Sequence, residues 1–84
     1  MRVEYSSTAK KQLKKLPRNK QIKVFSMIKK LKNDPYAGKK LKGEFKGLKS
    51  LKVWPYRIIY RYLSEDKLIY INVIEHRQRV YKRK

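Results

Sequence analysis

Four side chains that can bind phosphate, move a proton or stack on a base lie close together near the end of the sequence. They are His76, Arg77, Arg79 and Tyr81, and they follow a run of strand-forming residues, YINVIE. Arginine binds phosphate with a planar fork of donors, histidine titrates near neutral pH, and tyrosine offers an aromatic face. Two interpretations are open: a solvated basic tail, or a strand end that holds these groups over a substrate.

The net charge narrows the choice of partner. The 84 residues carry 25 Lys and Arg against 6 Asp and Glu, a formal charge of +19. A compact domain with this charge repels itself, so we expect it to bind a polyanion such as nucleic acid, the ribosome or an acidic protein. Because 40% of the residues are apolar and regularly patterned, the chain is not simply a disordered basic tail.

Several kinds of active site are excluded by composition. The chain has no cysteine, and therefore no thiolate nucleophile, disulfide or cysteine-ligated metal. One histidine and six scattered carboxylates do not form the ligand pattern of a zinc centre. A metal-independent nuclease stays open, because RNA carries its own nucleophile in the 2′-OH and needs only orientation and charge stabilisation.

No segment of the sequence predicts a membrane anchor. The first residues, MRVEYSST, lack the apolar core of a signal peptide, and no apolar run approaches about 18 residues. We therefore expect a protein of the cytoplasm with no membrane partner.

The elements that must position the polar groups follow from hydrophobic period, capping residues and turn residues. The predicted elements, in order, are a strand (2–5), two helices (from Ser6 or Ser7 to about 16, and from about 17 to 32), a loop (36–47) and three strands (48–53, 56–63 and 67–75).

The order β-α-α-β-β-β predicts an α+β fold, a small antiparallel sheet with the helical hairpin packed on one face. The last strand is nearly continuously apolar, which is typical of a central strand covered on both faces. In the strand over 56–63, Arg57 and Arg61 share one face, and Lys52 in the preceding strand points away from the apolar positions. This face is predicted to bind a polyanion. Trp54, at the tight turn between these strands, is more typical of packing than of recognition.

Two longer segments resemble a known family. They are DPYAGKKLKGEFKGLKSLKVWPYRIIYRY and the terminal VIEHRQRVYKR, and in this order and spacing they are similar to the RelE toxins of the RelE/ParE toxin–antitoxin superfamily. The resemblance covers nearly the whole chain and indicates a single RelE-like domain over residues 1–84.

The resemblance implies an activity and partners. A RelE toxin has a small sheet with a helical pair, an acidic or amphipathic antitoxin wrapped around it in a hetero-oligomer, and cleaves mRNA in the ribosomal A site. The chemistry would be attack by the 2′-OH, leaving a 2′,3′-cyclic phosphate and a 5′-hydroxyl, without a metal or cofactor.

The resemblance also implies roles for single residues. Arg57 of YRIIY matches the arginine that contacts the scissile phosphate, and Arg77 of HRQRVY matches the second catalytic arginine. Lys52 matches the second of two basic residues that alternate on the preceding strand, and Tyr81 matches the tyrosine that stacks on the substrate base. The predicted RNA-binding residues beside them are Lys39, Lys40, Lys42, Lys46, Lys49, Ser50, Arg61 and Arg79.

One departure from the family pattern leaves the general base open. Ser50 stands where the first alternating basic residue is expected, with Lys49 beside it on the other face. Lys52 and His76 are therefore alternative bases.

The target is open as well. ParE-type members of the superfamily act on DNA gyrase with a similar fold, and fold alone does not decide function. The joint presence of Lys52, Arg57, Arg77 and Tyr81 favours the nuclease. A catalytically weak module that binds RNA or the ribosome is the third alternative.

Overall fold

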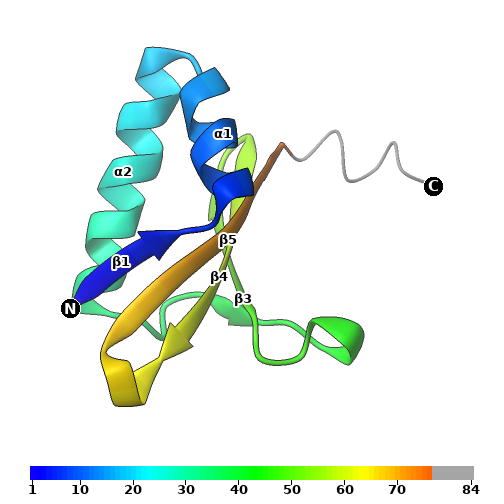
Figure 1. The fold of residues 1–84 in the computed structure, drawn as a ribbon. Helices are drawn as coiled ribbons and strands as arrows, with labels where there is room; N and C mark the ends of the chain where they lie inside the picture. Colours follow the sequence, from blue (N-terminus) through cyan, green and yellow to red (C-terminus); the bar gives the residue numbers. More distant parts are fainter. Residues whose placement is uncertain (77–84) are drawn as a thin grey trace.

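The structure is a computed structural model of the chain and describes residues 1–76. Two helices, α1 (Ser7–Lys15) and α2 (Arg18–Asn33), pack on one face of a five-stranded sheet (Figure 1). The strands are β1 (Arg2–Tyr5), β2 (Lys39–Lys40), β3 (Lys49–Val53), β4 (Tyr56–Leu63) and β5 (Leu68–His76). Short 3₁₀ turns, η1 (Gly43–Phe45) and η2 (Ser64–Asp66), lie in the β2–β3 and β4–β5 connections. The predicted α+β fold is confirmed.

The sheet has the order β1-β5-β4-β3-β2 and is mixed. The predicted antiparallel arrangement holds for β2 to β5, whereas β1 pairs in parallel with β5. A parallel neighbour is possible here because the chain crosses over through two helices before it returns to this edge. Residues 36–47 are predicted to be a loop, but they contain the short strand β2. It pairs with β3, Lys39 with Ser50 and Lys40 with Lys49.

The core lies between the helices and the sheet. In α2 the buried residues Val24, Ile28 and Leu31 follow the helical spacing of one face, while Ile22 and Phe25 are exposed. The buried side chains of the core cluster are Ala9, Leu13, Val24, Ile28, Leu31, Val53, Ile58, Tyr60, Ile69, Ile71 and Ile74.

The start of α1 is fixed by Ser6. Its hydroxyl accepts a hydrogen bond from the Ala9 amide at 3.0 Å, which caps the helix as predicted. The same hydroxyl donates to the Asn72 carbonyl at 2.6 Å, and the Ser6 amide donates to the Ile71 carbonyl at 2.9 Å. One residue therefore caps α1 and attaches it to β5.

A bulge interrupts β5 beside this contact. Ile59 pairs with Val73 but Tyr60 pairs with Ile71, so Asn72 is an extra residue in β5. Beyond the bulge, the Ile74 amide donates to the Gln12 side-chain carbonyl at 2.6 Å. Because β1 ends at Tyr5, α1 supplies the partners that the exposed edge of β5 would otherwise lack.

A buried tyrosine holds the segment that precedes β2. The Tyr60 hydroxyl donates to the Pro35 carbonyl and accepts from the Gly38 amide, both at 2.9 Å. A methyl group on Gly38 would lie 2.5 Å from the Tyr60 hydroxyl oxygen, so the backbone approaches the ring more closely than any side chain would permit.

Candidate nucleic-acid interface

The face of the sheet opposite the helices carries Lys52 and Arg57, two of the residues predicted to act on a polyanion. Alternation along β3 and β4 directs Val53, Ile58 and Tyr60 into the core, and therefore directs Lys52 and Arg57 to the other side. We call this other side the open face. The period-2 pattern of both strands predicted this placement from the sequence.

Lys52 and Arg57 lie directly opposite each other on β3 and β4, and Glu75 on β5 lies opposite Arg57. Side chains in such positions have Cβ atoms about 4.5–5.5 Å apart. Like charges directly opposite destabilise a sheet, and an anion bound between them would remove that cost. Lys52 is exposed and Arg57 is half-buried, so solvent reaches both cations. The row Lys52–Arg57–Glu75 therefore places two cations, which suit the binding of one phosphate, beside one carboxylate.

Two further predicted RNA-binding residues belong to the open face. Ser50 lies between Lys39 and Ile59 in the register of the sheet, one row from Lys52 and Arg57. Arg61 is exposed farther along β4, opposite Tyr70. Arg61 extends the basic surface away from the row, and Ser50 adds a hydroxyl group beside it.

Other predicted RNA-binding lysines lie elsewhere. Lys49 faces the helix side, where its ammonium group lies 5.4 Å from the centre of the Tyr36 ring, and Lys40 is its partner in the sheet. Lys42 and Lys46 are exposed on either side of η1 in the β2–β3 loop.

His76 does not lie on the open face. It pairs with Tyr56 in the sheet, and the two rings meet edge to face with centroids 5.1 Å apart. Tyr56 packs against the core, so the imidazole lies on the helix side of the sheet, across from Lys52 and Arg57. Arg77, Arg79 and Tyr81 lie outside the described residues, and their roles stay predictions.

The bulge at Asn72 decides which side chains of β5 reach the open face. Without it, strict alternation after Ile69 and Ile71 would direct Glu75 to the core and His76 to the open face. With one extra residue, Ile74 enters the core and Glu75 lies beside Arg57. Sequence reasoning missed Glu75 because a bulge leaves no reliable local signal.

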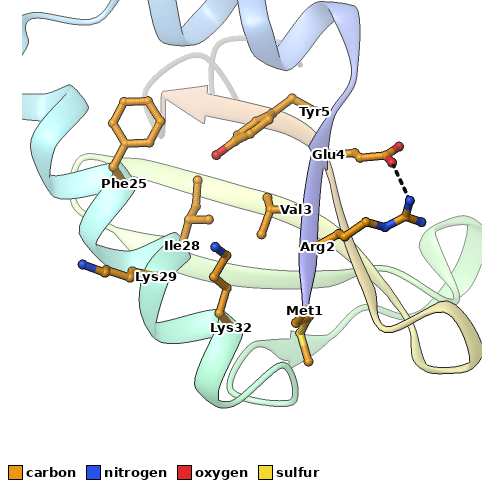
Figure 2. A pocket seen from close by; sticks show the side chains of 9 residues that line it. All are labelled: Met1, Arg2, Val3, Glu4, Tyr5, Phe25, Ile28, Lys29 and Lys32. Atoms are coloured by element: carbon orange, nitrogen blue, oxygen red, sulfur yellow. Dashed lines mark ion pairs between the residues drawn. The ribbon is translucent and has the colours of Figure 1, made fainter.

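A second surface feature lies between β1 and α2. It is a groove of about 650 Å³ lined by Met1, Arg2, Val3, Glu4, Tyr5, Phe25, Ile28, Lys29 and Lys32. Figure 2 shows Phe25 and Ile28 of α2 facing Val3 and Tyr5 of β1 across it. Lys32 extends from α2 beside Ile28, toward the space between α2 and β1, whereas Lys29 points away from β1 (Figure 2). Both lysines line the groove, which therefore combines an apolar floor with positive charge. Because β1 ends the strand order, it also presents a sheet edge here.

Residues 1–76 were also compared with the requirements of a metal site and of a membrane-spanning helix. Within them, no group of three His, Cys, Asp or Glu side chains is arranged to hold a metal ion. Neither described helix has the length and apolar character needed to cross a membrane.

Comparison with known proteins gives one family and a set of similar structures. Residues 3–81 match the model of a family described as the ParE toxin of type II toxin–antitoxin system, parDE. The chain is 31% identical to a chain of the toxin–antitoxin complex RelBE2 from Mycobacterium tuberculosis, with a TM-score of 0.83 over 90% of this chain and 96% of that chain. No curated protein gives a significant match.

Two more distant structures have the same fold. A chain of the archaeal RelE–RelB complex from Pyrococcus horikoshii is 27% identical, with a TM-score of 0.79 over 93% of this chain and 96% of that one. The YoeB/ParE toxin from Agrobacterium tumefaciens is 18% identical, with a TM-score of 0.81 over 90% of this chain and 98% of that one.

Proposed function

Because this chain belongs to the ParE toxin family of type II toxin–antitoxin systems, within the RelE/ParE superfamily, we propose that it is a ribosome-dependent endoribonuclease that cleaves mRNA in the A site. The observation that carries this proposal is the position of Lys52 directly opposite Arg57 on an exposed sheet face. Two cations on adjacent strands suit the binding of one backbone phosphate. Acting on ribosomes, the protein would work in the cytoplasm.

The proposed reaction needs no metal ion. The 2′-oxygen of the RNA attacks the adjacent phosphorus, and the bond from phosphorus to the 5′-oxygen of the next nucleotide breaks. Arg57 binds the phosphate and stabilises the charge that develops on it, with Arg77 as the second cation. A 2′,3′-cyclic phosphate and a 5′-hydroxyl result, once the 2′-OH proton has gone to a base and the 5′-oxygen has gained a proton.

Lys52 is the base that we propose, in preference to His76. The two residues lie on opposite sides of the sheet, and this supports the choice. Lys52 is the neighbour of Arg57 on the open face, whereas His76 contacts Tyr56 on the helix side. Glu75, the other neighbour of Arg57, can also accept a proton. Variants at these three positions separate the alternatives. Tyr81 is proposed to stack on the substrate base, with the exposed lysines adding salt-dependent affinity.

Inhibition of DNA gyrase is the second candidate function, favoured by the match to a ParE family model. One experiment tests both. The purified protein is incubated with programmed ribosomes and mRNA, and separately with gyrase and plasmid DNA, alongside Arg57→Ala and Arg77→Ala. We expect primer extension to locate cuts within A-site codons that both variants lose. Intact mRNA with blocked supercoiling would make the protein a gyrase inhibitor, and ribosome binding without either activity would make it a binding module.

We further propose that the cognate antitoxin occupies the groove between β1 and α2. Among the structures to which this chain is similar, RelBE2 is a toxin–antitoxin complex and the archaeal structure is a RelE–RelB complex. The groove offers an apolar floor, lysines at its margin and a strand edge, which together suit an acidic segment with apolar residues. Since the protein has a charge of +19, an acidic partner would also relieve its self-repulsion.

A further inference from the structure

A small cavity lies beside the turn between β3 and β4. It measures about 250 Å³ and is lined by Lys23, Ser26, Met27, Val53 and Trp54. Met27 and Val53 form an apolar floor that belongs to the core or packs on it. The ammonium of Lys23, the hydroxyl of Ser26 and the indole of Trp54 supply charge, a polar group and an aromatic surface.

Trp54 is not a core residue, although its position at a tight turn is typical of packing. Its side chain is 64% exposed, while most of the apolar residues of the adjoining strands are buried or half-buried. Leaving an indole mainly in water gives up the stabilisation that burial would provide. An aromatic surface kept exposed beside cations is a feature of proteins that bind single-stranded nucleic acid.

The cavity lies on the helix side of the sheet, at the end of the β3–β4 hairpin that carries the proposed phosphate site on its other face. Trp54 follows Lys52 by two residues, which places their backbones roughly 7 Å apart at about 3.3 Å per residue. Val53 and Tyr56 form the last pair of the hairpin, one step beyond the pair of Lys52 and Arg57. An RNA strand with its phosphate at Lys52 and Arg57 can therefore pass over the end of the sheet and reach Trp54.

We propose that the Trp54 cavity is a nucleobase subsite for the RNA nucleotide next to the scissile phosphate. The base stacks on the indole and contacts Met27, while the Lys23 ammonium binds the phosphate of that nucleotide. The five lining residues include one cation and no carboxylate, which suits an anionic ligand. The cavity is smaller than pockets for drug-sized ligands, about 300–1,000 Å³, and its size suits a single planar base rather than a helix of a partner protein.

This proposal deepens the proposed function and rests on it for the choice of RNA. Its test does not depend on cleavage, because Trp54 is the only tryptophan in the chain and its fluorescence reports on this site alone. Short single-stranded 2′-O-methyl RNA, which has no free 2′-OH and stays intact, is titrated into the full-length protein. Binding is followed in parallel by the anisotropy of a label on the RNA. A matched oligomer lacking bases and inorganic polyphosphate serve as charge-only controls.

We expect RNA to quench Trp54 fluorescence over the same concentrations at which anisotropy rises, and neither control to do so. Trp54→Ala should bind this RNA roughly tenfold more weakly, whereas Trp54→Phe keeps most of the affinity. Lys23→Ala should weaken binding and reduce its salt dependence. Phe45→Ala, which removes an exposed aromatic residue outside the cavity, should bind as the unaltered protein does.

The subsite is rejected if saturating RNA leaves the fluorescence unchanged, or if polyphosphate quenches it equally. Quenching by an acidic antitoxin peptide but not by RNA would reject it in favour of a protein partner. On ribosomes, Trp54→Ala should raise KM more than it lowers kcat. If Trp54→Ala cleaves mRNA with an unchanged KM, the subsite is rejected and the nuclease proposal stands. If RNA quenches the fluorescence of the unaltered protein but this protein cleaves no mRNA on ribosomes, the subsite stands and the nuclease proposal is rejected.

Discussion

The imidazole of His76 meets the ring of Tyr56 edge to face, with centroids 5.1 Å apart, on the side of the sheet that the helices cover. Arg57 is the next residue along β4 and therefore lies on the opposite face. The only histidine in the chain is thus separated by the sheet from the row of Lys52, Arg57 and Glu75.

This separation predicts different effects at the two proposed bases. Lys52→Ala should lower A-site cleavage by on the order of 10²-fold or more, since a positioned base typically contributes that much. His76→Ala should cost less than about tenfold and leave the pH profile unchanged. The measurement is the single-turnover rate on programmed ribosomes, with Lys49→Ala as the control from the other side of β3. If His76→Ala lowers the cleavage rate more than Lys52→Ala does, His76 is the base. If Glu75→Gln lowers the rate strongly, the Glu75 carboxylate is the base.

Arg57 and Arg61 form a matched pair for testing the phosphate site, because both belong to β4 and share the open face. Arg57→Ala should lose on the order of 10²-fold in cleavage rate, the usual cost of one transition-state donor, and so should Arg77→Ala. Arg61→Ala should change mainly the salt dependence of ribosome binding. Equal losses in Arg57→Ala and Arg61→Ala, with both proteins folded and bound, would contradict a single site centred on Arg57.

Ser6 should stabilise the fold through both of its side-chain hydrogen bonds. Ser6→Ala removes the cap of α1 and the bond to the Asn72 carbonyl, and should lower the free energy of unfolding by about 1–2 kcal/mol. Ser7→Ala is the control, since Ser7 is exposed in the first turn of the same helix. Urea denaturation followed by circular dichroism measures both, and equal midpoints for the two variants would refute the role given to Ser6.

The Tyr60 hydroxyl should make stability depend on pH in the alkaline range. Burial raises the pKa of Tyr60 above its ordinary value of 10.0, with the Asp34 carboxylate raising it further and the Gly38 hydrogen bond opposing the rise. Since the folded pKa exceeds the unfolded one, this contribution is complete below about pH 10 and decreases as pH rises through the folded value. Tyr60→Phe should cost about 1–3 kcal/mol at neutral pH by leaving the Pro35 carbonyl and the Gly38 amide unpaired.

The check is denaturant unfolding of both proteins from pH 7 to pH 11. The stability difference between the unaltered protein and Tyr60→Phe should shrink above about pH 10, a comparison that cancels the titration of the lysines. A difference that stays constant to pH 11 would show that the hydroxyl does not contribute in this way.

If the antitoxin binds in the groove between β1 and α2, a substitution there should weaken antitoxin binding without lowering nuclease activity. Phe25 is 49% exposed there, so Phe25→Lys should leave the fold intact and weaken antitoxin binding by on the order of 10-fold or more. Phe45→Lys alters a similarly exposed phenylalanine outside the groove and should bind the antitoxin normally. Isothermal titration with the cognate antitoxin measures both, and ribosomal cleavage by Phe25→Lys should be unchanged. Equal affinities would place the antitoxin elsewhere.

Much of this molecule follows from local sequence pattern. The alternation of apolar and polar residues predicts β4 over 56–63 as observed and directs Lys52 and Arg57 to one face. A serine cap at Ser6 or Ser7 and the NDP sequence after α2 predict the limits of the helical pair, and the structure selects Ser6. These features depend on residues within a few positions of one another, where steric preference and hydrophobic period act directly.

The placement of β1 and the orientation of the end of β5 depend on tertiary structure. The bulge at Asn72 exchanges the faces reached by Glu75 and His76, and its neighbours are held by Ser6 and Gln12, which lie more than 60 residues earlier in the chain. A strand shifted by one residue reverses every side chain beyond the shift, and only packing against other elements selects the shift. The sequence by itself thus determined that a basic pair would lie on the open face, while long-range hydrogen bonding to α1 decided that a carboxylate, and not the histidine, lies beside it.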